Sequence, residues 1–213
     1  MQSETDNAIP VPPRIGDKAP AFSARATTGH VSLADFRGQW LVLFSHPADF
    51  TPVCTSEFVA LARKADEFAK RDCALMALSI DTLFSHFAWL RLIRDRFGIE
   101  VRFPVIEDPT MVIASAYGMT MPGDADNWGV RSTYFIDPEG TIRAITCYPP
   151  NVGRSIPEML RLLDALQAAD RSSALTPADW QKGDMLLNPP GEALDAVYAA
   201  DNPGDWFWQE RRK

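Results

Sequence analysis

Short apolar runs alternate along this sequence with segments of helical periodicity. Residues 40–44 (WLVLF) and 74–80 (ALMALSI) are almost entirely apolar, as in strands that are covered on both faces. After each run, over residues 56–69 and 83–97, apolar side chains recur every three or four positions, as on one face of an amphipathic helix. This order predicts buried strands that alternate with amphipathic helices, as in an α/β fold.

The rest of the pattern predicts an α/β fold with a mixed central sheet. The turn composition of Asp137-Pro-Glu-Gly140 indicates a hairpin, and Gly98 and Gly118 are placed to end helices. The further expected elements are strands over 101–106 (interrupted by Pro104), 132–136 and 141–148, and helices over 110–117 and 156–166.

The composition changes near residue 170. Residues 174–213 carry four prolines and four tryptophans or phenylalanines, but little periodicity. We therefore expect a domain over residues 1–170, followed over 171–213 by a C-terminal arm that packs on something and does not fold independently.

The charge balance argues against nucleic acid and anionic membranes as main partners. Lys and Arg number 21 and Asp and Glu number 28, which gives a net charge of −7 without a basic cluster typical of nucleic-acid binding. No window approaches the roughly 20 apolar residues of a membrane span, and no segment resembles a signal peptide. We expect a cytoplasmic protein with neither nucleic acid nor membrane as a partner.

Three cysteines, Cys54, Cys73 and Cys147, are spread along the chain without a CxxC pair. This odd number and wide spacing disfavour a disulfide scaffold and a structural zinc site. Cys73 and Cys147 lie in or beside apolar strands, which suits buried packing residues.

Cys54 lies where a strand gives way to a helix. Thr51 is a favoured N-cap type and Pro52 is typical of the first helical position, so Cys54 falls at the third. The unpaired N–H groups and the positive dipole at that end favour a thiolate. From the residues alone, a reactive Cys54 and a merely buried Cys54 both remain open.

The stretch Pro47-Ala-Asp-Phe-Thr51-Pro-Val-Cys54 resembles the active-site signature of the peroxiredoxins. Residues 16–22, 79–81 and 131–137 are also similar to that family. Residues 176–180, the tail beyond them, and His46 resemble the one-cysteine, peroxiredoxin-6-like subgroup.

The resemblance implies a thioredoxin-like fold that reduces hydrogen peroxide and organic hydroperoxides. Cys54 would attack the peroxide as a thiolate and become a sulfenic acid. Thr51 would hydrogen-bond to the sulfur and the substrate oxygens, and Pro47 would form an apolar wall. Arg131 would stabilise the thiolate and the leaving oxygen, a role that rests on the resemblance alone because nothing in the spacing singles out this cation.

Two further candidates are His46 and Glu57. His46 could make a polar contact with the peroxide or with the reducing partner. The alternative is a structural histidine at a strand end whose hydrogen bonds are all made within the protein. Glu57, about one turn after Cys54, would support Arg131. No cofactor is expected, and a metal site from His46 and Cys54 lacks further ligands.

The chain has no cysteine after Cys147, so the arm offers no resolving thiol. We therefore expect an external thiol, small or protein, to reduce the sulfenic acid, while the sequence leaves open whether Cys73 or Cys147 ever resolves it. By resemblance we also expect a homodimer or a higher homo-oligomer. The alternatives are a redox sensor or a chaperone-like oligomer on the same fold.

Overall fold

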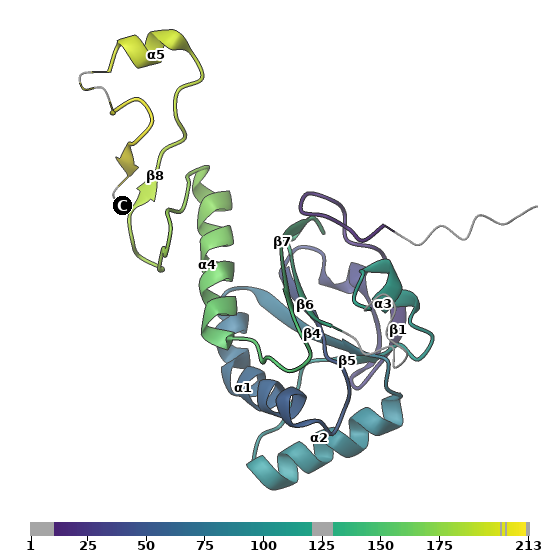
Figure 1. Cartoon of the computed structure of the whole chain (residues 1–213). Coiled ribbons are helices and arrows are strands. Elements are labelled where there is room, and N and C mark those ends of the chain that lie inside the picture. The colour runs from purple at the N-terminus through teal and green to yellow at the C-terminus, as the bar shows by residue number, and fades with distance from the viewer. Residues whose placement is uncertain (1–10, 121–129, 201, 203, 212–213) are drawn as a thin grey trace, which may run out of the picture. The chain divides into compact units, whose positions relative to one another are not determined.

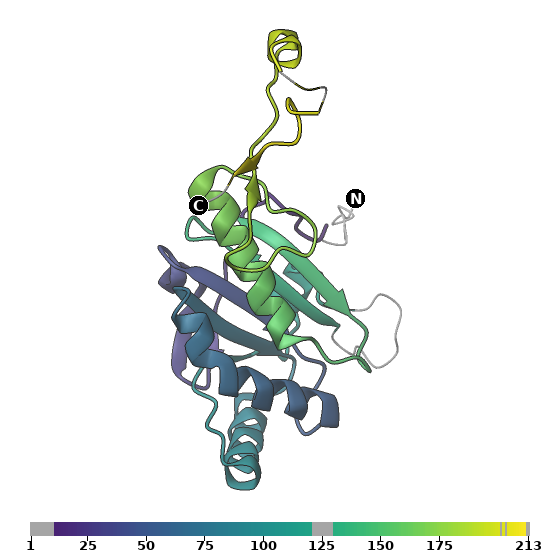
Figure 2. The same ribbon diagram turned by 90° about the vertical axis from the view of Figure 1, so that its left-hand side faces the viewer.

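The computed structural model describes residues 11–120, 130–200, 202 and 204–211 of the 213-residue chain. The chain divides into two compact units, Met1–Ile156 and Pro157–Lys213, whose elements can be followed in Figures 1 and 2. The expected division into a domain over residues 1–170 and an arm over 171–213 stays a prediction, because compactness alone assigns no role to either part.

A seven-stranded sheet forms the centre of the first unit. Its order is β2-β1-β5-β4-β3-β6-β7, with β3 parallel to β4, β4 parallel to β5, and the other neighbours antiparallel. The predicted mixed sheet and α/β class are thereby confirmed. The strands are β1 (Ser23–Ala26), β2 (Gly29–Ser32), β3 (Trp40–Ser45), β4 (Cys73–Ser79), β5 (Val105–Glu107), β6 (Arg131–Ile136) and β7 (Ile142–Tyr148).

Helices α1 (Pro52–Ala69) and α2 (Leu83–Phe97) pack on one face of this sheet (Figure 1). Side chains alternate along a strand, so Phe44 of β3 points to that face, with its ring 5.8 Å from Phe58 of α1. Phe58 in turn lies 4.5 Å from Trp89 of α2, between ring centroids. The helix that carries Cys54 is therefore anchored by an aromatic core.

The opposite face of the sheet has its own core. Leu41 and Leu43 of β3 join Met76 of β4 and the fully buried Tyr117. Tyr117 directly follows the short helix α3 (Val112–Ala116), and the 3-10 helix η1 (Leu33–Phe36) adds Leu33 to the same cluster. Both faces of β3 are covered, as its continuous apolar run predicts.

Two local features differ from the sequence prediction. The strand expected from residue 101 begins only at Val105, because Pro104 has no N–H and contributes only its carbonyl, which accepts from Ala77. The hairpin of β1 and β2 was not predicted, since its strands are four residues long and lack apolar alternation.

The second unit contains most of α4 (Ile156–Ser172), the two-stranded sheet of β8 (Leu186–Leu187) and β9 (Glu210–Arg211), and α5 (Leu194–Tyr198). Its small core consists of Ala165, Ala174, Trp180 and Leu186. Among the helices of the described ranges, none is long and apolar enough to cross a bilayer.

Candidate active site

The loop from β3 to α1 places Cys54 in the first turn of a helix. Phe50 takes a left-handed conformation (φ 57°), Thr51 is the N-cap and Pro52 is the first helical residue. Cys54 is therefore the third residue of α1, as the sequence predicts. Its side chain is completely buried. The positive end of an 18-residue helix consequently acts on a sulfur that is withdrawn from water.

Thr51 occupies the cap position but makes no side-chain capping bond. Its hydroxyl instead donates to the carbonyl of Ala48, at 2.9 Å. Because the hydroxyl proton is used in this bond, Thr51 Oγ1 can act toward other groups only as a hydrogen-bond acceptor. Pro47, at the start of the same loop, is buried.

Arg131 reaches the sulfur from the first position of β6. Its Nη1 lies 3.3 Å from Cys54 Sγ and 2.8 Å from Glu57 Oε2. Its Nε and Nη2 donate to the carbonyl of Pro150 at 2.9 and 2.7 Å, so the planar guanidinium is held on two sides. The structure thus brings together Cys54, Arg131 and Glu57, three of the predicted site residues, in one buried cluster.

Glu57 is the counter-ion of this cluster and has a second arginine as partner. Arg154 donates from its backbone N–H and Nε to Oε1, at 2.8 and 2.9 Å, and from Nη2 to Oε2, at 2.7 Å. Burial by itself would raise the pKa of Glu57, but the hydrogen bonds and charge of Arg154, with the charge of Arg131, lower it overall. The carboxylate is therefore held ionised between two guanidinium groups.

Arg154 was missed by sequence analysis. It follows β7 in a loop and is one of 21 cations, and no spacing relates it to α1. It is 7% exposed, its Nη1 lies 3.2 Å from the carbonyl of Ser132, and its guanidinium lies over the ring of Phe44, at 5.0 Å from the centroid. Only the tertiary fold reveals its role as partner of Glu57.

His46 lies in a second buried chain of polar groups. Its Nε2 is 3.0 Å from Asp49 Oδ1, and His86 Nδ1 is 2.7 Å from the other oxygen of Asp49. Burial lowers the pKa of His46, whereas hydrogen bonds from both histidines outweigh burial and lower the pKa of Asp49. His46 Nδ1 has no hydrogen-bond partner among the described residues. Neither Asp49 nor His86 was predicted from sequence.

Among the described residues, His46, Asp49 and His86 also form a group that could hold a metal ion. One ligand atom from each of His46, Asp49 and His86 lies within 4.8 Å of the others. The Asp49 carboxylate already interacts with both imidazoles, so a cation would have to displace both contacts. His46 and Cys54, which the sequence disfavours as a metal pair, do not belong together to any such group of three among the described residues.

The other two cysteines differ from Cys54 and from each other. Cys73, the first residue of β4, is buried as predicted, and burial raises the pKa of its thiol to about 12. Cys147 of β7 is exposed, so its assignment as a buried packing residue is wrong. The error arises because Cys147 lies near the end of the outermost strand, whose outward side chains are left uncovered.

Comparison with known sequences gives a consistent result. A model of the AhpC/TSA family matches residues 15–145. A peroxiredoxin of Aquifex aeolicus is 53% identical over 210 residues, which cover 92% of this chain and 95% of that protein. A peroxiredoxin of Methanosarcina mazei is 44% identical over 192 residues, covering 87% of this chain and 88% of its own.

Solved structures extend the likeness to the fold. A yeast mitochondrial 1-Cys peroxiredoxin, studied for thiol resolution via glutathione/thioredoxin systems, matches with a TM-score of 0.84 and 37% identity. The match covers 94% of this chain and 100% of the other. A cysteine-to-serine mutant of the peroxiredoxin 6 of Arenicola marina matches with a TM-score of 0.80 and 33% identity, covering 87% of each chain.

Proposed function

This chain belongs to the AhpC/TSA family and is a thiol-dependent peroxidase of the 1-Cys peroxiredoxin type, and on that premise we propose that Cys54 attacks the peroxide. The observation that carries this assignment is the 3.3 Å contact between Arg131 Nη1 and a sulfur in the first turn of α1. A guanidinium and a helix N-terminus both favour the negatively charged form of that sulfur.

In the proposed step, the Cys54 thiolate attacks one oxygen of the hydroperoxide. An S–O bond forms as the O–O bond breaks, so the sulfur is oxidised to sulfenic acid and the second oxygen leaves as alkoxide or hydroxide, which then takes up a proton. Arg131 stabilises the charge that develops on the leaving oxygen. The Thr51 hydroxyl, whose proton is donated to Ala48, accepts the hydrogen bond of the peroxide O–H.

We predict that Arg131→Lys lowers the rate of peroxide consumption by about a hundredfold, in line with the loss of one oriented donor to a developing charge. An ammonium is a point charge and cannot serve the Pro150 carbonyl, Glu57 and Cys54 together, as the guanidinium does. Stopped-flow consumption of hydrogen peroxide by the reduced protein measures the rate. Arg143→Lys, on β7 and paired with Asp137 at 3.3 Å, is the control. A wild-type rate in Arg131→Lys contradicts the role.

We further propose that an external thiol completes the cycle. Both remaining cysteines are poorly placed for resolution. Cys73 is buried with a raised thiol pKa. Cys147 is paired with Ser132, with its sulfur 3.7 Å from the Ser132 hydroxyl. The neighbouring Arg131 side chain, by contrast, points to the opposite face of the sheet, where Cys54 lies. The yeast relative, whose thiol resolution runs via glutathione/thioredoxin systems, supports a small or protein thiol as the reductant.

We predict that brief oxidation with one equivalent of peroxide leaves Cys54 as a sulfenic acid. Because neither Cys73 nor Cys147 is expected to resolve it, dimedone should add once per chain, at Cys54, and thiol addition should restore the reduced mass. Intact mass under non-reducing conditions, followed by peptide mapping, makes the measurement. A disulfide from Cys54 to either other cysteine, within a chain or between chains, would refute the one-cysteine cycle.

The predicted homodimer and cytoplasmic location belong to the same proposal. Phe207 and Trp208 of the second unit are 51% and 50% exposed, an apolar surface that a second copy would cover. Light scattering on the intact chain tests this assembly. Three free cysteines support a reducing compartment, and fractionation of the source cells tests the location.

A further inference from the structure

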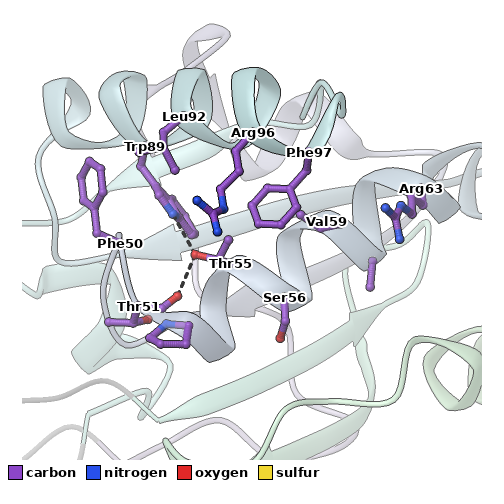
Figure 3. A pocket seen from close by; sticks show the side chains of 12 residues that line it. Phe50, Thr51, Thr55, Ser56, Val59, Arg63, Trp89, Leu92, Arg96 and Phe97 are labelled. Carbon is purple, nitrogen blue, oxygen red and sulfur yellow. Dashed lines mark hydrogen bonds between the residues drawn. The ribbon is translucent and has the colours of Figure 1, made fainter.

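A groove runs between α1 and α2 (Figure 3). Its cavity volume is about 810 Å³, within the range of small-molecule sites. We call it the α1–α2 groove, and its side chains of interest are Phe50, Val59, Arg63, Leu92, Arg96 and Phe97. Cys54 does not line it, but Thr51 does, so the groove adjoins the proposed peroxide site without including the attacking sulfur.

The groove leaves large apolar side chains in contact with water. Phe50 is 54% exposed, Leu92 44% and Phe97 40%. An apolar ligand that covers these side chains removes apolar surface from water, which favours binding. The groove is thus suited to a hydrocarbon.

Two unneutralised cations lie in the same groove. Arg63 and Arg96 are exposed, and within the described ranges neither forms an ion pair, although the chain has a net charge of −7. By comparison, Arg91 and Arg94 of α2 both form an ion pair with Asp95. Figure 3 shows the Arg96 side chain extending from α2 toward α1 into the groove, beside Phe97.

The floor of the groove is held in place without a ligand. Trp89 is completely buried and its Nε1 donates to Thr55 Oγ1 at 3.1 Å, while Thr55 Oγ1 donates to the carbonyl of Thr51 at 2.7 Å. These two bonds tie α2 to the start of α1 (Figure 3). A preformed surface loses little entropy when it binds a ligand.

We propose that the α1–α2 groove binds a long-chain carboxylate. The hydrocarbon covers Phe50, Leu92 and Phe97. The carboxylate pairs with the guanidinium group of Arg63, which suits a planar anion, and Arg96, on the other side of the Phe97 ring in Figure 3, adds positive charge to the groove. Along α1 the groove extends from Thr51 to Arg63, roughly 18 Å at 1.5 Å per residue, which accommodates an extended chain of about twelve carbons. This site does not depend on the chemistry assigned to Cys54.

Isothermal titration of the full-length protein with sodium dodecanoate, below its micelle concentration, tests the proposal. We expect saturable binding with one site per chain. The double variant Arg63→Ala/Arg96→Ala should bind about tenfold more weakly, because the charge-assisted contact and the second positive charge of the groove are both lost. Both side chains are exposed, so the substitutions leave the core intact.

Two controls make the result decisive. Arg94→Ala removes an exposed arginine of α2 that pairs with Asp95 and does not line the groove, and it should bind dodecanoate like the wild type. Dodecanol, with the same chain and no charge, should bind more weakly than dodecanoate to the wild type. No saturable binding, equal binding by the double variant, or equal binding of dodecanol would each overturn the proposal. The titration reads binding alone, so its failure leaves the peroxidase assignment untouched.

Discussion

Replacing Cys54 with serine is expected to abolish the stoichiometric burst of peroxide consumption, with a rate loss of more than about a thousandfold. The substitution changes one atom in a completely buried side chain, so the cluster with Arg131 should persist. A hydroxyl beside the same guanidinium does not ionise near neutral pH and is not oxidised by peroxide, whereas a thiolate is a strong nucleophile. Stopped-flow mixing of the reduced protein with hydrogen peroxide measures the burst.

Cys147→Ser is the matched control for this prediction. Cys147 is exposed on β7, so its replacement should disturb neither the core nor the burst. If Cys54→Ser retains the burst, or if Cys147→Ser loses it, the assignment of Cys54 as the attacking residue is wrong.

The second large effect concerns stability. Glu57→Gln should lower the free energy of unfolding by about 3 kcal/mol, because it leaves Arg131 and Arg154 buried without their shared counter-ion. A glutamine also presents an N–H₂ group to guanidinium donors that need an acceptor. Urea unfolding followed by circular dichroism gives the difference at pH 7.

Glu67→Gln, on the same helix, is the control. Glu67 lies on the surface and pairs with Lys70 at 2.9 Å and Arg71 at 3.3 Å, so water replaces those partners at little cost. The two variants therefore compare the loss of a buried carboxylate with the loss of a surface carboxylate on the same helix. Equal unfolding midpoints for wild type and Glu57→Gln would contradict the buried-pair argument.

The pH dependence of this difference has a definite sign. The pKa of Glu57 is lower in the folded chain than in the unfolded chain, so its contribution is complete above the unfolded value of about 4.3. As the pH falls through the folded pKa, the carboxylate is protonated and the contribution is lost. The stability gap between wild type and Glu57→Gln should therefore narrow in acid, and a gap that widened would contradict the assignment.

The local chemistry of the site could be predicted from a few adjacent residues. Thr51 and Pro52 define where α1 begins, and Cys54 falls in its first turn, because capping and the fixed φ of proline act within a few positions of the chain. The apolar runs of β3 and β4 are similarly local signals of buried strands.

The partners of the sulfur could not be found in that way. Arg131 is 77 residues from Cys54, and it was named only through the family resemblance. It reaches the sulfur because β6 runs antiparallel to β3, with Phe44 opposite Thr133, so that the beginning of β6 lies beside the end of β3. Arg154, 97 residues from Glu57, had no signal of any kind in the sequence.

The sequence by itself therefore determined the central strands β3 and β4, the start of α1 and the position of Cys54 in its first turn, since these depend on short-range propensity and periodicity. Tertiary structure alone decided which charges surround Cys54, that Asp49 joins His46 to His86, and that Cys147 is exposed. The physical reason is that electrostatic stabilisation depends on distances of a few ångströms in space. Such distances are set by strand register and packing between segments that lie far apart along the chain.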